Sequence, residues 1–278
     1  MMEGYVMEQI KIHILHTGTV IVDEALPFST VSRNPLAWTG LFRSKKHQVA
    51  LPVSAYLIEH PKGLILIDTG WHTDNRTKQI RNLSFQYPVN KAVLPAGQAI
   101  HEQLAQLGYK PSDIDYILMS HMHCDHADGL RLVKHAKRIM LSEPEYDAIQ
   151  TDKMHYLQHE WKGVHLQPFK FEDTGIGPQG KSYDVFGDNS VQMIWVPGHS
   201  KGLCATKITN DYQDYVLLAS DVGYAEKSWK EEILPGVLVD KEAAIKSLKW
   251  VKDSAKDKHC IEAIANHDRH IQPHCILL

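Results

Sequence analysis

A chain of 278 residues with 43% hydrophobic side chains has enough apolar material to bury a core, as one large domain or two small ones. The formal net charge is −3, so no basic field would attract the phosphates of a nucleic acid, and nucleic acids are excluded as expected partners. The four cysteines lack a C-x-x-C pair, which disfavours a thiolate zinc cluster and is typical of reduced thiols in the cytosol.

The N-terminal residues 1–8 contain two glutamates and no basic residue, and no apolar run as long as a signal peptide or a membrane span follows them. We therefore expect a soluble, cytoplasmic protein without membrane insertion. Because no internal repeat or Pro/Gly/Ser-rich linker divides the chain, the sequence favours a single domain over residues 1–278 that contains two sheets.

The predicted elements begin with residues 10–22, where alternating, β-branched residues indicate two short strands around Gly18. Residues 23–50 have no regular pattern. Their basic cluster, residues 43–47, is interpreted as a solvated loop, and the alternative is a loop that overhangs the site and helps to shape substrate access.

Two apolar runs, 51–59 and 64–68, flank the turn residues 60–63 and predict a hairpin. Asp68, at the end of the second run, is either a tight-turn residue or a partner that orients a metal-binding histidine. Residues 71–97 are expected to be a loop with short helical pieces.

A helix over 98–107, closed by Gly108, leads into a strand over 116–120, and open sheets usually place their sites at such a strand end. Four potential ligands follow directly: His121, His123, Asp125 and His126. Imidazole and carboxylate groups suit Zn²⁺ and neighbouring divalent metals. Among 18 histidines, close pairs also arise by chance as solvated loop residues, but the added Asp-His pair favours a metal site.

Beyond this motif we predict a helix over 127–136, a strand over 138–141 and a helix that is capped by Ser142, with Glu145 three residues on. The segment 150–185 is rich in His, Gln, Lys and Gly. Its three histidines have no partner at ligand spacing, so they are interpreted as surface residues over a mobile or substrate-facing insert: His155, His159 and His165.

Three later strands end in further candidate ligands. The pairs are 191–196 with His199, 215–220 with Asp221, and 260–265, interpreted as the last strand, with His267. Each residue alone is more typical of a satisfied buried histidine or a turn carboxylate, but the repeated arrangement favours one site. Asp240 caps a predicted amphipathic helix over 241–256 with the buried stripe Ala244, Ile245, Leu248, Val251 and Ala255.

One partition of these ligands gives three residues to each of two divalent ions. The first set is His121, His123 and His199, the second is Asp125, His126 and His267, and Asp221 bridges them. A bound ion lowers the pKa of its water to about 7, so a shared hydroxide can act as nucleophile. Zn²⁺ is the expected ion, with Fe, Mn or Co as alternatives, and no Gly-x-Ser-x-Gly motif competes.

The order of these motifs resembles that of the metallo-β-lactamase superfamily over essentially the whole chain. The motifs are Asp-Thr-Gly, His-x-His-x-Asp-His, Pro-Gly-His, an Asp after an apolar strand and a final His. The resemblance implies an αββα sandwich of two mixed β-sheets flanked by helices, with a dinuclear site along one edge. Asp221 in place of a cysteine disfavours a true β-lactamase.

Within the superfamily, the chain is most similar to the N-acyl-homoserine lactonases, which open the lactone ring of quorum-sensing signals. Four features carry this similarity: residues 51–57, the strand end 67–70, the Asp221-x-x-Tyr224 pair and residues 266–268. Two residues depart from the common pattern, because Cys124 stands where an aromatic or other apolar residue is frequent and Asn266 where glycine is common.

The resemblance implies that the bridging hydroxide attacks the lactone carbonyl while one ion polarises its oxygen. Tyr224 would donate a hydrogen bond to the oxyanion or the ring oxygen, and Asp125 would carry the proton to the leaving alkoxide. The alternative for Tyr224 is a packed aromatic whose hydroxyl bonds a backbone group. The expected partner is a small lactone or related ester, and a homodimer is compatible with the sequence.

Two other classes stay open. A thioesterase of the glyoxalase II type or a phosphodiesterase would use the same metal site, although phosphate chemistry needs extra cations that only residues 43–46 and the surroundings of Arg269 offer. A non-catalytic metal-binding domain is disfavoured because the ligand set is complete.

Overall fold

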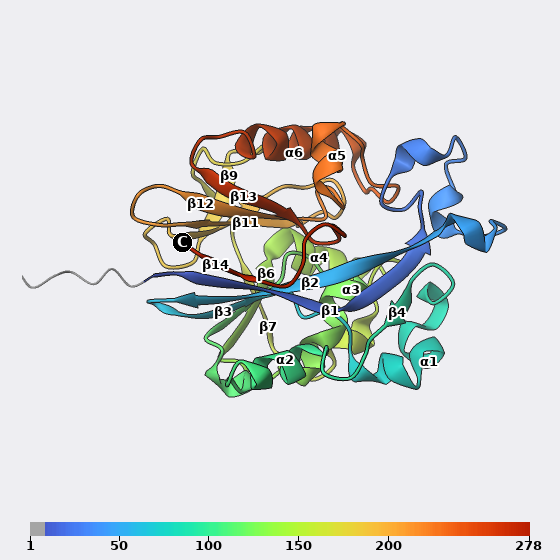
Figure 1. Ribbon diagram of the computed structural model, residues 1–278, viewed down its shortest axis with the longest axis horizontal. Helices are drawn as coiled ribbons and strands as arrows, with labels where there is room; N and C mark the ends of the chain where they lie inside the picture. The colour runs from blue at the N-terminus through green and yellow to red at the C-terminus, as the bar shows by residue number, and fades with distance from the viewer. Residues whose placement is uncertain (1–8) are drawn as a thin grey trace, which may run out of the picture.

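The computed structural model describes residues 9–278, and residues 1–8, for which we expect no targeting signal, lie outside that range. Two β-sheets pack face to face, and helices cover the outer face of each (Figure 1). This is the predicted αββα arrangement of two mixed sheets flanked by helices. Among the helices of the described part, none has the length and apolar character to cross a bilayer.

The first sheet has eight strands within residues 9–278, in the order β14-β1-β2-β3-β5-β6-β7, with β4 against β1. These strands are β1 (Lys11–Asp23), β2 (Gln48–His60), β3 (Gly63–Ile67), β4 (Lys91–Val93), β5 (Tyr116–Leu118), β6 (Arg138–Ser142), β7 (Leu166–Phe169) and β14 (Cys275–Leu277). Strands β3, β5, β6 and β7 pair in parallel. The carboxyl ends of β3 and β5 therefore meet at one edge, where residues 119–126 begin.

The second sheet has six strands in the described residues, in the order β13-β12-β11-β10-β9-β8. They are β8 (Glu172–Asp173), β9 (Lys181–Asp184), β10 (Val191–Trp195), β11 (Cys204–Thr209), β12 (Tyr215–Ser220) and β13 (Cys260–Ala265). Strands β10 and β12 both run antiparallel to β11, and β13 is parallel to β12. Three strands thus run the same way, and their carboxyl ends lie at the same edge of the sheet.

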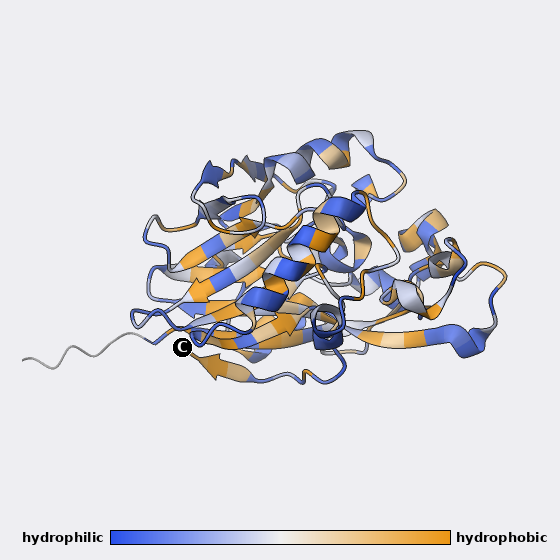
Figure 2. Cartoon of the chain, turned by 90° about the horizontal axis from the view of Figure 1, so that it is seen from above, coloured by the Kyte–Doolittle hydropathy of each residue, from blue (hydrophilic) through white to orange (hydrophobic). Residues whose placement is uncertain are grey.

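The main core fills the space between the sheets, and each sheet is also buried on its outer side. In β3, Ile65 and Ile67 face the second sheet while Leu66 packs under the outer helices, as the two-residue period of a strand requires. The helices are α1 (Gln79–Leu83), α2 (Ile100–Gln106), α3 (Cys124–Ala127), α4 (Glu143–Thr151), α5 (Glu226–Lys230) and α6 (Lys241–Ser254). Figure 2 shows hydrophobic colour on the strands and mixed colour on the covering helices.

Several local predictions are confirmed. The hairpin of β2 and β3 forms with antiparallel pairing, and α2 ends before Gly108, which has a positive φ of 87°. The side chain of Ser142 caps α4 by accepting a hydrogen bond from Glu145 N at 3.3 Å. Asp240 caps α6 in the same way through Ala243 N.

The prediction of two strands around Gly18 is wrong. Strand β1 is continuous, and a register shift between His16 and Thr19 absorbs the glycine as a bulge. Gly18 has φ of 90°, and a Cβ there would lie 2.4 Å from the carbonyl oxygen of Val93 in β4. A side chain is excluded at this position because β4 approaches the bulge closely.

The predicted helix over 127–136 is also wrong, since α3 ends at Ala127 and a 3₁₀ segment, Asp128–Leu132, follows. The Asp128 carboxylate accepts hydrogen bonds from His72 N and from two asparagine side chains, and these contacts fix the chain in a non-helical path. In α6, Ile245 is 50% exposed, because the buried stripe runs through Ala244, Ser247, Leu248 and Val251. Strand β13 is not the last, because β14 follows.

Candidate metal centre

Four strand ends bring the predicted ligands to one edge of the sandwich. The segment with His121, His123, Asp125 and His126 follows β5 of the first sheet. His199 follows β10, Asp221 follows β12 and His267 follows β13, all in the second sheet. All seven side chains lie in three overlapping groups whose ligand atoms are within 4.8 Å of one another.

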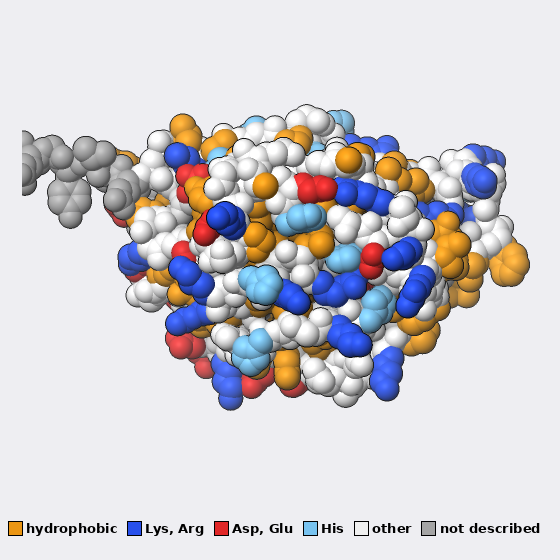
Figure 3. Space-filling model, turned by 90° about the horizontal axis from the view of Figure 1, so that it is seen from below, with side chains coloured by type: hydrophobic (Ala, Val, Ile, Leu, Met, Phe, Trp, Pro, Cys, Tyr) orange, Lys and Arg blue, Asp and Glu red, His pale blue; other side chains and the backbone are white. Residues whose placement is uncertain are grey.

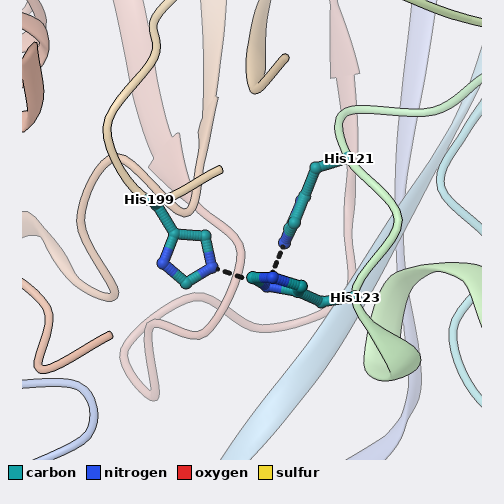
Figure 4. Close-up of side chains that lie close together, drawn as sticks. All are labelled: His121, His123 and His199. Carbon is teal, nitrogen blue, oxygen red and sulfur yellow. Dashed lines mark hydrogen bonds between the residues drawn. The ribbon is translucent and has the colours of Figure 1, made fainter. Parts of the chain in front are cut away.

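The first group consists of three histidines, shown in Figure 4. His121 Nε2 lies 3.1 Å from His123 Nδ1, and His123 Nδ1 lies 2.9 Å from His199 Nε2. Three ring nitrogens therefore converge on one point from two different sheets. Neutral imidazole nitrogens arranged in this way are typical of a site for Zn²⁺ or a related transition metal.

The second group contains Asp125, His126 and His267. His267 Nε2 lies 3.4 Å from Asp125 Oδ2, and His126 Nε2 lies 3.9 Å from Asp125 Oδ1. Both histidines are fully buried, whereas the Asp125 side chain is partly accessible. This group can hold a second ion with one carboxylate and two imidazole ligands.

Asp221 stands between the two groups and contacts both. Its Oδ1 lies 3.4 Å from His126 Nε2 and 3.3 Å from His267 Nε2, in the second group. Its Oδ2 lies 3.4 Å from His199 Nε2 in the first group. The two oxygens of one carboxylate thus face different clusters, which is the arrangement that a bridging ligand requires.

Several buried atoms at this centre lack a hydrogen-bond partner in the described residues. Besides His123 Nε2, they include three atoms that each lie within 3.4 Å of another of the three: His126 Nε2, His267 Nε2 and Asp221 Oδ1. A buried polar atom without a partner is destabilising by about 1–3 kcal/mol. Divalent cations would satisfy all three atoms at once, so these residues fit a metal pair.

The two groups differ electrostatically. Burial, together with the neighbouring imidazoles, holds the pKa of His121 and of His123 well below its usual value. Burial acts on His126 in the same direction, but the summed charge of Asp221, Asp125 and Asp68 raises its pKa well above the usual value. The first group therefore offers neutral imidazoles at pH 7, while the carboxylates of Asp221, Asp125 and Asp68 surround the second group with the negative charge that attracts a cation.

Partners outside the two groups orient the rings through the opposite nitrogen. Asp68 Oδ2 lies 2.8 Å from His126 Nδ1, and the same carboxylate accepts hydrogen bonds from Ser120 N and Ser120 Oγ. His199 Nδ1 and His267 Nδ1 each lie about 3 Å from a backbone carbonyl. Of the two interpretations of Asp68, the geometry supports a partner that orients a histidine.

Glu145 also supports the centre, and sequence reasoning assigned it only to a helix cap. Its fully buried carboxylate accepts four hydrogen bonds, from Met122 N, Tyr156 Oη, Ser200 Oγ and Gly202 N. Met122 lies between two histidines of the first group, and Ser200 follows His199. Glu145 thus ties together the two segments that supply this group.

A cavity of about 470 Å³ opens beside the two groups and includes His123, Asp125 and His199 in its wall. Much of the remaining wall is apolar: Val20, Leu26, Trp38, Leu41, Phe85 and Met154. The segment 23–50 contributes Leu26, Trp38, Thr39 and Leu41 to the wall, but no residue of the basic cluster 43–47. The segment 150–185 contributes Met154 and His155, whereas His159 and His165 lie outside the cavity wall.

Tyr224 lies in the cavity wall, against the second group. Its ring stacks on that of His267, with 4.7 Å between ring centroids and 18° between planes. Burial and the nearby carboxylates of Asp221 and Asp125 raise its pKa well above 10. The hydroxyl is therefore protonated at neutral pH and can donate a hydrogen bond inside the cavity.

Beside the cavity, the segment between β1 and β2 projects from the sandwich (Figure 1). Leu36, Leu41 and Phe42 of this segment are exposed, and Phe42 is fully so, at 106%. In Figure 3, hydrophobic side chains gather at the end of the molecule from which this segment projects. The cavity wall thus continues into an exposed apolar end.

Comparisons with known proteins agree with this arrangement. Residues 49–249 match the metallo-beta-lactamase superfamily. The N-acyl homoserine lactonase AttM of Agrobacterium fabrum is 29% identical over 248 residues, which cover 83% of this chain and 90% of AttM. The N-acyl homoserine lactonase AiiA of Bacillus thuringiensis subsp. kurstaki is 30% identical over 214 residues, which cover 74% of this chain and 77% of AiiA.

A solved structure of one of these relatives, AiiA, is also similar to this chain. A crystal structure of a Bacillus thuringiensis AiiA mutant, with N-decanoyl-L-homoserine bound at the active site, has a TM-score of 0.76 and 25% identity to this chain. The match covers 95% of each chain. The similarity therefore extends through both sheets and all four strand ends that carry the candidate ligands.

Proposed function

Because the chain belongs to the metallo-beta-lactamase superfamily, we propose that it is a dinuclear metal-dependent hydrolase that opens the lactone ring of N-acyl-homoserine lactones. The observation that carries the proposal is the carboxylate of Asp221, whose two oxygens are divided between two histidine groups beside an apolar cavity. The named activity of AttM and AiiA supports the lactone as substrate.

The proposed ligands are those that the sequence predicts. His121, His123 and His199 would hold the first ion, Asp125, His126 and His267 would hold the second, and Asp221 would contribute one carboxylate oxygen to each. Zinc is the proposed metal, because imidazole and carboxylate donors with few ligands per ion suit it. When bound, such a pair supplies a hydroxide near neutral pH and a positive charge that polarises a carbonyl oxygen.

The chain's own residues complete the reaction. The protonated hydroxyl of Tyr224 donates a hydrogen bond to the oxygen on which negative charge develops. The partly accessible Asp125 takes the proton of the attacking water at a carboxylate oxygen and delivers it to the leaving alkoxide. The apolar wall of the cavity excludes water and accommodates an acyl chain.

The cavity wall argues against phosphodiesters as substrates. Among the described residues that line it, none is a lysine or an arginine, and Arg43 is instead paired with Asp23 at 2.6 Å. Phosphoryl transfer relies on such cations to neutralise the charge on the phosphate. A thioester carries no such charge and therefore stays the main competing substrate.

The test combines a metal count with hydrolysis assays. Zinc per chain is measured by plasma mass spectrometry, and acid release is followed in a pH-stat with homoserine lactones of several acyl lengths, a thioester and bis(p-nitrophenyl) phosphate. The proposal predicts two ions per chain and the highest kcat/KM on a lactone. Faster turnover of the thioester or the phosphodiester, or fewer than two ions in an active preparation, would refute it.

A homodimer is proposed as the state of the enzyme in solution. Its support is the exposed apolar end formed by Leu36, Leu41 and Phe42, since contiguous apolar surface is usually covered by a partner. Light scattering after gel filtration tests this proposal. A monomer mass at about 100 μM protein would contradict it.

A further inference from the structure

His155 lies in the wall of the cavity although it belongs to neither metal group. Its ring centroid is 6.2 Å from that of His123, with 36° between the planes. The side chain is 39% exposed and lines the cavity. A substrate at the metal centre would therefore contact this ring.

Asp152 fixes the orientation of that ring. Its Oδ2 lies 2.7 Å from His155 Nδ1, and its Oδ1 accepts hydrogen bonds from His155 N at 3.1 Å and from Met154 N at 2.9 Å. A carboxylate accepts only, so Nδ1 must carry the proton that it shares with Asp152. In the neutral ring this leaves Nε2 as an acceptor that is free for a ligand.

An N-acyl-homoserine lactone brings a donor to this position. Its amide nitrogen is bonded to the carbon next to the lactone carbonyl, so it lies only about 2.5 Å from the carbon under attack. The amide N–H loses its hydration when the substrate enters the cavity and needs an acceptor there. The acceptor must be close to the metal groups without being a ligand.

Two cavity-wall residues outside the metal groups have rings beside proposed ligands. Tyr224 stacks on His267 of the second group, and His155 lies beside His123 of the first group. The Tyr224 hydroxyl is a donor engaged with the oxyanion in the proposed reaction. Thr39 Oγ1 donates to Leu36 O and accepts from Leu41 N, whereas Gln86 and Asn90 donate through their amide nitrogens and keep a carbonyl oxygen. We favour His155 Nε2 over these two oxygens because a carboxylate, Asp152, orients the His155 ring and because that ring lies beside His123 of the first group.

We propose that His155, held by Asp152, accepts a hydrogen bond from the amide N–H of the substrate and so selects N-acylated lactones over lactones without an amide. This inference rests on the proposed lactonase function and gives His155 a role in substrate selection. The step involves binding only, so no bond is made or broken at His155.

The test compares two lactones of similar length, N-hexanoyl-homoserine lactone and α-hexyl-γ-butyrolactone, which lacks the amide. The ratio of their kcat/KM values is measured for the wild type and for His155→Phe, which keeps a ring but removes the acceptor. The ratio should fall about tenfold, as expected for one lost hydrogen bond. His155→Gln, which keeps an acceptor oxygen, should restore part of the ratio, and Asp152→Ala should lower it.

A binding measurement adds a readout that does not depend on turnover. Calorimetric titration of the zinc-loaded protein with N-hexanoyl-L-homoserine, which keeps the amide, should give an about tenfold weaker dissociation constant for His155→Phe. The matched control is His165→Phe in the same segment, because His165 is exposed and lies outside the cavity wall. Zinc content should stay the same in all variants.

Three results would overturn the inference: an unchanged ratio in His155→Phe, an equal loss on both lactones, or the same change in His165→Phe. If the wild type opens the amide-free lactone but shows no preference for the acylated one, only this inference fails. If the wild type opens neither lactone, the proposed function fails and this inference fails with it.

Discussion

Replacing Glu145 by glutamine should loosen the first metal group without touching any proposed ligand. The carboxylate accepts hydrogen bonds from Met122 N at 2.9 Å on Oε1 and from Gly202 N at 2.9 Å on Oε2. A glutamine amide has one acceptor oxygen and one NH₂ group. In either orientation, one of these two backbone N–H groups therefore faces another donor.

The magnitude follows from that mismatch. One buried, charge-assisted hydrogen bond is lost and one backbone donor is left unsatisfied, which together lower the free energy of unfolding by about 3 kcal/mol. For a chain of 278 residues, this corresponds to a fall in Tm of about 5 °C. Because both segments that Glu145 joins supply histidines of the first group, zinc should also dissociate faster.

The assay is a thermal melt followed by circular dichroism, together with zinc content after dialysis against a chelator. Glu143→Gln is the matched control, since Glu143 lies in the same helix, has a half-exposed side chain and, among residues 9–278, forms an ion pair only with Lys170. We expect its Tm to stay within about 1 °C of the wild type. A Glu145→Gln variant that melts and retains zinc like the wild type would refute the reasoning.

Three further predictions concern the site and the fold. Tyr224→Phe should lower kcat/KM on lactones about 10- to 100-fold at an unchanged zinc count, and unaltered kinetics would remove Tyr224 from the mechanism. Removing the metal with a chelator should abolish hydrolysis and lower the Tm, and zinc should restore both; activity that persists without metal would contradict the proposal. The paired Arg76 lowers the pKa of Glu102 from 4.5 to about 2. The Arg76–Glu102 pair therefore stabilises the folded state fully above pH 4.5, and this contribution is lost as the pH falls toward 2. Glu102→Gln should therefore destabilise by about 1 kcal/mol at pH 7, with a difference that shrinks below pH 4.5 in urea titrations; a constant difference would contradict this.

The sequence indicated which side chains meet at this edge because each candidate ligand is marked locally. His121 and His123 stand two residues apart directly after an apolar run, and His199, Asp221 and His267 each follow another such run. Strand ends are readable in the sequence, and the directions of the strands then bring these ends to one edge. The αββα fold itself was predicted from a resemblance, since periodicity alone does not order the strands.

Residues whose role depends on tertiary contacts could not be assigned in this way. Glu145 looks like a helix-capping residue, and its contacts with Met122 and Gly202 arise only when α4 packs beneath both loops. His155 has no neighbour at ligand spacing, so the sequence placed it only over a mobile or substrate-facing insert, and its position in the cavity wall beside His123 could not be predicted. The predicted helix over 127–136 failed because the contacts of Asp128 outweigh local helix propensity.

The origin of the ligands in two sheets has a consequence for how the molecule folds. Among the candidate ligands, only those within residues 121–126 are near one another in the unfolded chain, whereas His267 is 141 positions beyond His126. An ion that contacted Asp125, His126 and His267 together would close that long loop as a non-covalent cross-link between the sheets. Metal affinity and the docking of the two sheets would then be coupled, so that each would strengthen the other.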